Sequence, residues 1–508
     1  MSRDGSHRLG SPLSEQFVAK SRLSSKLDLV PPSPEDDGHI ESPRAILDPY
    51  ARITLESLCD IPPYRVPAKP WTEATDDNDL VSHLVSLYFT WDHPCAQFVD
   101  QGIFLEHMRR GDLDSEFFSF QWQAYAASVV ILPILRFFLM PNRSILTARG
   151  VFSNPENAFS RGRNFFSEAE KLWKAQEGRS ALSSIQALVM MCCVLSYQGK
   201  ANLSWLMLQQ AIQLAHDIGL FMLPRAKYRC RENMTSDMEC ARAITAWGIF
   251  SLNQQMSMKL QKVATLSKPA SSIDVAGDHD FDWIPYPRSN QIMYAAKRAH
   301  LPQIRQGLAE MTDIMLHVED LLDDEELSMS STALCARVED PYNRLQQWLA
   351  DWRDASQTRK EPIPQLLILR VKGLHAMMHL VEMLIERDQQ GSMIAQLQQE
   401  WCAQAEEIAQ CLRIHRQSYG IWLIPSQVID IVQAVFYTLV HHQESSKSSN
   451  KVRHAFIEFC RFGIALGQKS KPMAETIYAI QSLSQRGSIQ LPTEAITILD
   501  GSKLWKCQ

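Results

Sequence analysis

Residues 180–224 decide the fold that we predict for this chain, and they read SALSSIQALVMMCCVLSYQGKANLSWLMLQQAIQLAHDIGLFMLP. Two apolar patterns follow one another across a break at Gly199, and each repeats at the three- and four-residue steps that place side chains on one face of an α-helix. Their apolar positions are Leu182, Ile185, Leu188, Val189, Cys192 and Leu195, then Trp205, Leu208, Ala211, Ile212, Ala215 and Ile218. Gly199 and Gly219 stand where a left-handed residue ends a helix, and Pro224 prevents continuation. We therefore predict a helical hairpin at the centre of an all-helical body.

The length and composition predict a large intracellular globular protein. The 508 residues, 45% of them hydrophobic, can bury a large core as one helical domain or as two packed lobes. The formal charge is only −6, and the basic residues are spread out, which argues against a nucleic-acid-binding surface over the whole protein. Eleven cysteines, several inside apolar patterns, are typical of a reduced intracellular protein. The first residues show no apolar signal core, and the apolar segments 126–140 and 187–195 are too interrupted or too short to span a membrane.

Residues 1–44 differ from the rest of the chain because they are rich in serine, proline and charge. They offer too few apolar side chains to offset the entropy lost on ordering, so we predict a disordered tail. Its basic residues Lys20, Arg22 and Lys26 are dispersed. We interpret them as part of a solvated tail, with a nuclear import signal as the alternative.

From about residue 45 onward, every element that we predict is a helix, and strand patterns are hard to find. A proline-punctuated acidic loop at residues 278–287 is the best candidate boundary. We predict an all-α fold, a large multi-helix domain of packed hairpins, with residues 45–287 as one region and residues 288–508 packed on it. The expected helical segments are residues 80–89, 98–108, 116–140, 157–176 and 237–260, then 299–322, 342–352, 367–385, 395–414, 428–439, 455–466 and 493–499.

The search for catalytic motifs is negative and favours a protein that is not an enzyme. The chain has no glycine-rich phosphate loop, no Gly-x-Ser-x-Gly elbow, no His-Glu-x-x-His motif and no closely spaced cysteines of the zinc-site kind. We therefore predict no catalytic, cofactor-binding or metal-binding residues, and no cofactor.

Three groups of residues give weaker indications of a binding site. His375 and His379 lie four apart on the expected helix 367–385, with Glu382 on the next turn, a spacing that suits a metal ion. We favour the interpretation that they border the apolar stripe of that helix. The acidic runs 319–320 and 323–326 could hold magnesium and a diphosphate, but a solvated charge run is the better explanation. Residues 280–283 and 319–322 mix acidic and apolar side chains and are either short partner-binding patches or, by default, surface loops.

Several strings, taken in order, resemble the middle homology region of fungal zinc-cluster transcription factors over roughly residues 80–287. Residues 211–221 resemble the family helix that ends in Gly-Leu-His, and residues 242–250 resemble its Arg-Arg-x-x-Trp-Trp helix. The other matching features are residues 88–94 (YFTWDHP), Phe98, Phe104 and the acidic loop that ends at Pro285.

This resemblance implies the helical regulatory body of a nuclear transcriptional regulator. In that family DNA is read by a cluster of six cysteines that holds two zinc ions, and no cysteine precedes Cys59 in this chain. Two explanations stay open: either contact with DNA is indirect, through other transcription factors or coactivators, or the sequence is a truncated gene model that lacks the cluster. A small-molecule effector and a homo- or heterodimer are further expected partners.

Two other classes of function remain open at this stage. One is an all-α scaffold of stacked hairpins, although no fixed repeat period is visible. The other is an all-α enzyme that uses diphosphates, which would need a second carboxylate motif facing residues 323–326.

Overall fold

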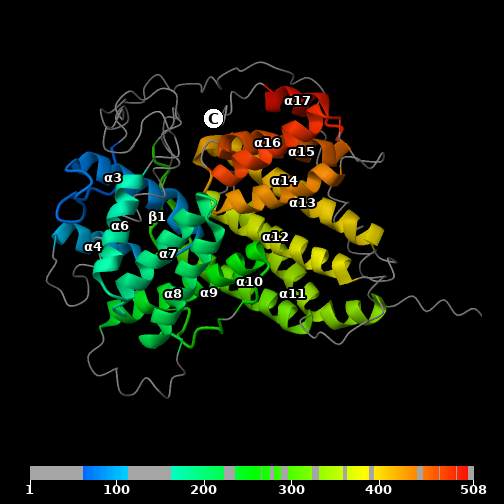
Figure 1. The fold of residues 1–508 in the computed structure, drawn as a ribbon. Coiled ribbons are helices and arrows are strands. Elements are labelled where there is room, and N and C mark those ends of the chain that lie inside the picture. Colours follow the sequence, from blue (N-terminus) through cyan, green and yellow to red (C-terminus); the bar gives the residue numbers. More distant parts are fainter. Residues whose placement is uncertain are drawn as a thin grey trace, which may run out of the picture.

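The computed structural model describes most of the chain after residue 60, and within the described residues almost all regular structure is helical (Figure 1). This confirms the predicted all-α fold. The predicted tail at residues 1–44 and the expected helix at 116–140 lie outside the described residues. The described ranges are 61–111, 162–221, 235–264, 266–274, 280–287, 296–322, 331–357, 363–387, 394–442, 450–467, 470–487 and 489–500.

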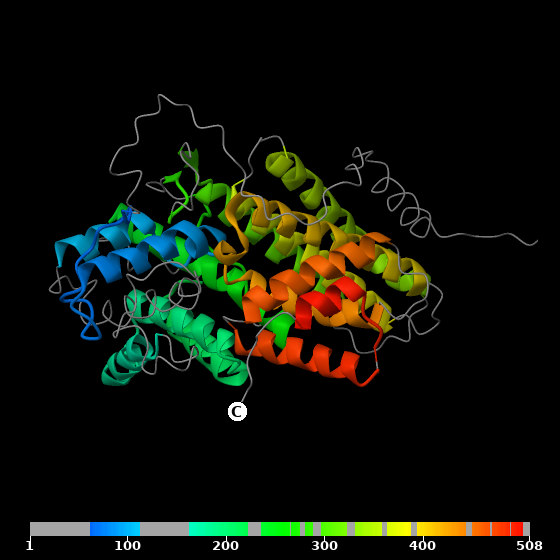
Figure 2. The ribbon, with the colours of Figure 1, turned by 90° about the horizontal axis from the view of Figure 1, so that it is seen from above.

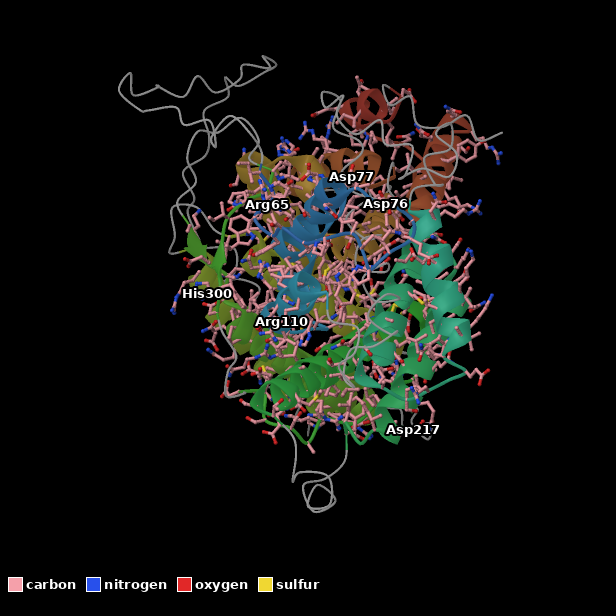
Figure 3. The ribbon with its side chains drawn as sticks, turned by 90° about the vertical axis from the view of Figure 1, so that its left-hand side faces the viewer. Arg65, Asp76, Asp77, Arg110, Asp217 and His300 are labelled. Carbon is pink, nitrogen blue, oxygen red and sulfur yellow. The ribbon has the colours of Figure 1, made fainter. Side chains whose placement is uncertain are left out.

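The first described elements form one end of the molecule, seen at the left of Figure 1 and face-on in Figure 3. Asp77 is the N-cap of α3, and its carboxylate accepts hydrogen bonds from the backbone N–H groups of Asp79 and Leu80, both at 3.0 Å. Asp100 caps α4 in the same way through the N–H of Ile103, at 2.8 Å. The elements are α3 (Asn78–Leu87), a π-helical turn (Tyr88–Asp92), a 3₁₀ turn (His93–Cys95), α4 (Gln101–Arg110) and α6 (Arg163–Ala175).

The predicted central hairpin is present as α7 (Leu182–Tyr197) and α8 (Ala201–Asp217). Gly199 and Gly219 both adopt the left-handed conformation, with φ of 76° and 69°, as the sequence predicts. The apolar stripe expected on one face of α7, however, describes only part of its buried surface. Every residue of α7 from Ser183 to Tyr197 is buried, because this helix packs against α6, α8 and α9 at once.

Helix α9 (Ser236–Leu260) follows, and then a chain of helices fills the rest of the body. Figure 2 shows α3 and α4 (blue) at one end and the orange and red helices α14–α17 toward the other. The remaining elements are α10 (Leu301–Leu322), α11 (Ser331–Gln357), α12 (Pro364–Arg387), α13 (Ile394–Tyr419), a 3₁₀ turn (Ile421–Leu423), α14 (Val428–His442), α15 (Asn450–Gly467), α16 (Lys471–Gln485) and α17 (Thr493–Asp500).

Two helices depart from the sequence-based expectation. The expected helix at 342–352 is the second part of the longer α11, which continues through Pro341. The sequence patterns did not predict helix α16. Its first turn contains Pro472, and proline is tolerated there because the backbone N–H groups of the first turn have no partner within the helix. None of the described helices is both long enough and apolar enough to cross a bilayer.

The acidic loop at residues 280–287 is packed into the N-terminal elements. Its strand β1 (Asp282–Trp283) pairs antiparallel with β2 (Lys297–Arg298). The indole Nε1 of Trp283 donates to the carbonyl oxygen of Thr90 at 2.7 Å, and that of Trp91 donates to the carbonyl oxygen of Tyr286 at 2.6 Å. Trp283 is only 3% exposed, so this side chain is not the surface feature that the pattern suggested. One cluster of buried apolar side chains runs through both predicted regions, and the division at residue 287 stays a prediction.

Replacing Trp283 with alanine is expected to lower the free energy of unfolding by about 3–5 kcal/mol, because a large buried ring and its hydrogen bond are both lost. Chemical denaturation measures this change. Tyr478→Ala on α16 is the matched control, since that ring is 67% exposed, and it is expected to change stability by less than about 0.5 kcal/mol. Equal effects of the two substitutions would contradict the packing described for the loop.

Candidate functional site

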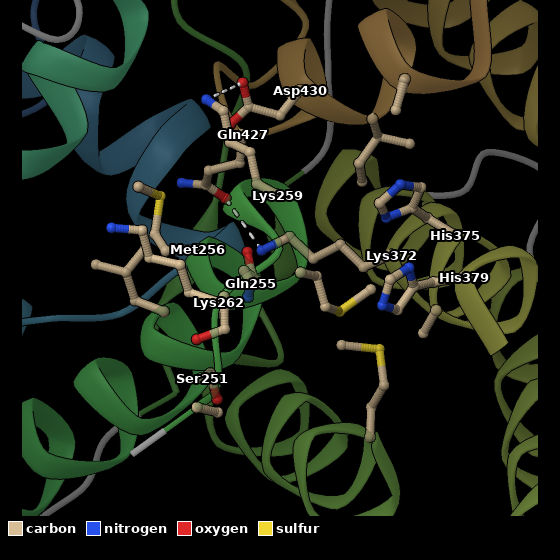
Figure 4. A pocket seen from close by; sticks show the side chains of 18 of the residues that line it. Ser251, Gln255, Met256, Lys259, Lys262, Lys372, His375, His379, Gln427 and Asp430 are labelled. Carbon is tan, nitrogen blue, oxygen red and sulfur yellow. Dashed lines mark hydrogen bonds and ion pairs between the residues drawn. The ribbon is translucent and has the colours of Figure 1, made fainter. Parts of the chain in front are cut away.

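A cavity of about 900 Å³ lies between α9, α10, α12 and α14 (Figure 4). Residues 96–98, part of α7 and the loop after α9 complete its walls. Its size lies within the range of small-molecule sites in proteins. The cavity reaches the surface beside Val263 and Tyr437, which are 65% and 59% exposed.

The inner end of the cavity carries a buried ammonium group. Lys372 is 4% exposed, and its Nζ donates to the carbonyl oxygen of Cys95 at 2.9 Å and to the side-chain oxygen of Gln427 at 3.4 Å. Burial lowers the pKa of Lys372 from 10.5 to about 8, and the nearby thiols of Cys95 and Cys193 oppose this effect only in part. Within the part of the chain that the structure describes, no carboxylate forms an ion pair with this ammonium.

Helix α12 also supplies the two histidines singled out from the sequence. From Pro364 to Val381 every residue is buried except His375 and His379, which are half-buried, and both of them line the cavity (Figure 4). Lys372, His375 and His379 recur at three- and four-residue steps, so they share one face of the helix. Burial lowers the pKa of His375 to about 4, and its ring is therefore neutral at pH 7.

Glu382 lies beyond the histidines, as the sequence indicated. Its Oε2 is 3.9 Å from Nδ1 of His379, and its Oε1 accepts a hydrogen bond from Nε1 of Trp401 at 2.8 Å. Burial alone would raise the pKa of Glu382, but the neighbouring His379 and the hydrogen bond from Trp401 outweigh this effect and lower it. Among the described residues, no three histidine, cysteine or acidic side chains are arranged to hold a metal ion. His375, His379 and Glu382 all line the cavity.

An ion pair crosses one side of the cavity and joins three helices. Nζ of Lys259 on α9 lies 2.7 Å from Oδ1 of Asp430 on α14, and it also donates to Oγ of Ser196 on α7 at 2.6 Å. Figure 4 marks the contact between Lys259 and Asp430. The carboxylate of Asp430 therefore pairs with Lys259 and not with Lys372.

Part of the wall is apolar. Four methionines and a leucine line it, and methionine side chains adapt readily to ligands of different shape. The acidic run 319–320 touches this wall: Glu319 accepts a hydrogen bond from Nε2 of Gln254 at 2.7 Å, and burial raises its pKa. The second run, 323–326, lies outside the described residues. The apolar lining residues are Met256, Met258, Met311, Leu316 and Met383.

Ala96 and Gln97 form the floor of the cavity, and they end a segment from Asp92 to Gln97 that we name the 92–97 segment. Oδ1 of Asp92 accepts hydrogen bonds from the backbone N–H of Ser426 at 2.9 Å and from its hydroxyl at 2.5 Å. At the other end, Nε2 of Gln97 donates to the carbonyl oxygen of Leu301 at 2.7 Å, and its Oε1 accepts from Arg305 at 2.9 Å. The floor is thus fixed to α10 and to the turn before α14.

Sequence reasoning missed Lys372, Lys259 and Asp430. A signal was present for the first of these, because Arg370 and Lys372 interrupt an otherwise apolar run on the expected helix 367–385. A charged residue in the middle of such a run is rarely buried unless something binds it. Lys259 and Asp430 are 171 residues apart, and no local pattern connects them.

Comparison with known proteins agrees with the resemblance noted in the sequence. A family model described as the fungal specific transcription factor domain matches residues 85–349, more than half of the chain. The chain belongs to this family.

Three curated relatives cover most of this chain. The nitrogen assimilation transcription factor nirA of Emericella nidulans is 23% identical over 85% of this chain and 47% of its own length. The notoamide biosynthesis transcriptional activator notL' of Aspergillus versicolor is 22% identical over 86% of this chain and 68% of its own. The nitrogen assimilation transcription factor nit-4 of Neurospora crassa is 21% identical over 88% and 40%. The chain thus spans about half the length of the first relative.

The buried histidines of the N-terminal elements predict a pH-dependent stability. Burial, assisted by the nearby charge of Arg305, lowers the pKa of His93 to about 4, and burial lowers the pKa of His83 to about 4 as well. The unfolded chain, in which histidine has a pKa of about 6.5, therefore binds more protons between about pH 6.5 and 4. We expect the free energy of unfolding to fall as the pH is lowered through this window, by up to about 1.4 kcal/mol per pH unit for each histidine.

Denaturation curves measured between pH 7 and pH 4.5 check this expectation. His93→Gln is expected to flatten the dependence on pH relative to the wild-type protein, whereas His454→Gln, at an exposed position on α15, leaves it unchanged. Identical pH slopes for the wild type and His93→Gln would show that His93 is not held neutral in the folded state.

Proposed function

We propose that this chain is a nuclear transcriptional regulator whose helical body controls gene expression through contacts with other proteins and with a small effector. The observation that carries this proposal is the family match over residues 85–349, together with relatives that are all named as transcription factors or activators. The relatives are named for different pathways, nitrogen assimilation and notoamide biosynthesis. Neither pathway is transferred to this chain.

In this proposal the chain is a regulator and not an enzyme. The cavity wall presents neutral histidine, an engaged ion pair and methionine side chains, an arrangement suited to binding. The scaffold alternative has less support, because an interior cavity of about 900 Å³ with a buried charge serves no purpose in a passive scaffold.

The cavity provides a physical route from effector to partner. Its walls come from α9, α10, α12, α14 and the 92–97 segment, so a ligand there contacts elements that also form the outer surface. A ligand changes activity only to the extent that it binds one arrangement of these helices better than another. Other transcription factors or coactivators would then bind the preferred arrangement, as part of a homo- or heterodimer or of a larger complex, and contact with DNA by these residues is indirect.

Deletion of the gene, combined with transcript profiling and localisation of a tagged full chain, tests this proposal. We expect a nuclear signal and a defined set of transcripts that change several-fold and return to normal when the gene is restored. A second arm fuses the full chain to an unrelated DNA-binding domain and measures a reporter, with the DNA-binding domain alone as control. Cytosolic residence with unchanged transcripts and a silent reporter would end the proposal.

A further inference from the structure

The inner end of the cavity holds a positive charge that the described part of the protein does not balance. Lys372 is almost fully buried and satisfies two of its three N–H donors with the neutral oxygens of Cys95 and Gln427. A buried ammonium without a counter-charge is costly, because neutral oxygens replace its hydration only in part. The nearest acidic wall residue of α14, Asp430, already pairs with Lys259 at 2.7 Å.

The groups around Lys372 suit an anion. The neutral ring of His375 lies one helical turn further along the same face of α12 and offers a second N–H donor. The amide of Gln427 is held in place by its donation to the carbonyl oxygen of Asp92 at 3.1 Å, so the floor beneath the ammonium is fixed. A carboxylate placed here would form a charge-assisted hydrogen bond in a site that excludes most water.

The remainder of the cavity suits an apolar body. Away from Lys372, the walls are lined by Met256, Met311, Leu316 and Met383, of which Met256 and Met311 are 4% and 5% exposed. The acidic groups Glu319 and Glu382 lie along these walls but have their own hydrogen-bond donors, Gln254 and Trp401. The inner end of the cavity therefore offers a buried positive charge, and these apolar walls lie beside it.

We propose that the cavity binds a small organic anion with an apolar body, whose carboxylate pairs with Lys372 and whose hydrocarbon part lies along the methionine wall. This assignment rests on the proposed function, because it names the chemical class of the effector. It also explains why Lys372 is buried on the face of α12 that lines the cavity. The ligand enters beside Val263 and Tyr437, where the cavity meets the surface.

Binding of three ten-carbon probes to the purified full chain tests this inference. The probes are decanoate, decan-1-ol and decyltrimethylammonium, and calorimetry and thermal unfolding measure their binding. We expect decanoate to bind the wild-type protein at least tenfold more tightly than decan-1-ol and to raise the melting temperature, while the cation binds no better than the alcohol. Equal binding of acid and alcohol, or no binding of decanoate, overturns the inference without any need for a variant.

Substitutions then locate the charge. Lys372→Met is expected to weaken decanoate binding at least tenfold and to leave decan-1-ol binding unchanged or tighter. Lys262→Met is the matched control, because Lys262 also lines the cavity but lies at its mouth, with Nζ 5.0 Å from the centre of the Trp205 ring, and it is expected to leave both affinities within about threefold. Decanoate binding that survives in Lys372→Met overturns the assignment.

The outcome is separable from that of the proposed function. If the reporter and the transcripts respond to the chain but decanoate does not bind, the ligand class is wrong and the regulator stands. If decanoate binds through Lys372 but the gene has no effect on transcripts, the cavity assignment stands and the proposed function fails.

Discussion

Buried hydrogen bonds of the 92–97 segment hold the helical body together. The carboxylate of Asp92 is bound to Ser426, which is 334 residues away in the chain, and the carbonyl oxygen of Cys95 is bound to Lys372, which is 277 residues away. Gln97 is bound to Leu301 and Arg305. Each contact pairs a polar group that would be expensive to bury alone. Loss of one partner therefore leaves its mate unsatisfied inside the core, and the N-terminal elements, α10, α12 and α14 depend on one another.

The same segment explains where the cavity lies. Its hydrogen bonds to α10, α12 and the turn before α14 place Ala96 and Gln97 at the floor of the cavity, between the helices that form the walls. The result is an interior space with a charged end and an apolar wall. Sites of this kind are where a sequence departs from the rule that cores are apolar, and α12 shows the departure most clearly at Lys372 and His375.

Periodicity predicted much of the fold because amphipathic helices leave a local trace. The hairpin of α7 and α8 with its left-handed glycines, and α9, follow directly from spacing and glycine placement. Pro341 hid the first part of α11, since a proline usually ends a helix. The loop at 280–287 suggested a boundary because of its proline and aspartate content, whereas Trp283 and Tyr286 anchor it to the core. The division of the chain at residue 287 stays a prediction.

The cavity could not be predicted in this way. Its floor, its charged end and its ion pair come from residues far apart in sequence, and their approach depends on how the helices pack. The spacing of His375 and His379 suits a metal ion, and the sequence alone favours the interpretation that they border the apolar stripe of their helix; the packing places both on the cavity wall, on one face with Lys372.

Hydrogen exchange of the wild-type protein and of Asp92→Ala, followed by mass spectrometry, tests most directly whether the 92–97 segment unites the body. We predict that the substitution raises exchange together in peptides of the N-terminal elements, of α12 and of α14, by roughly ten- to a hundredfold, because it leaves the Ser426 donors buried without their acceptor. An increase confined to the peptide that contains residue 92, with α12 and α14 as protected as in the wild type, would contradict the account.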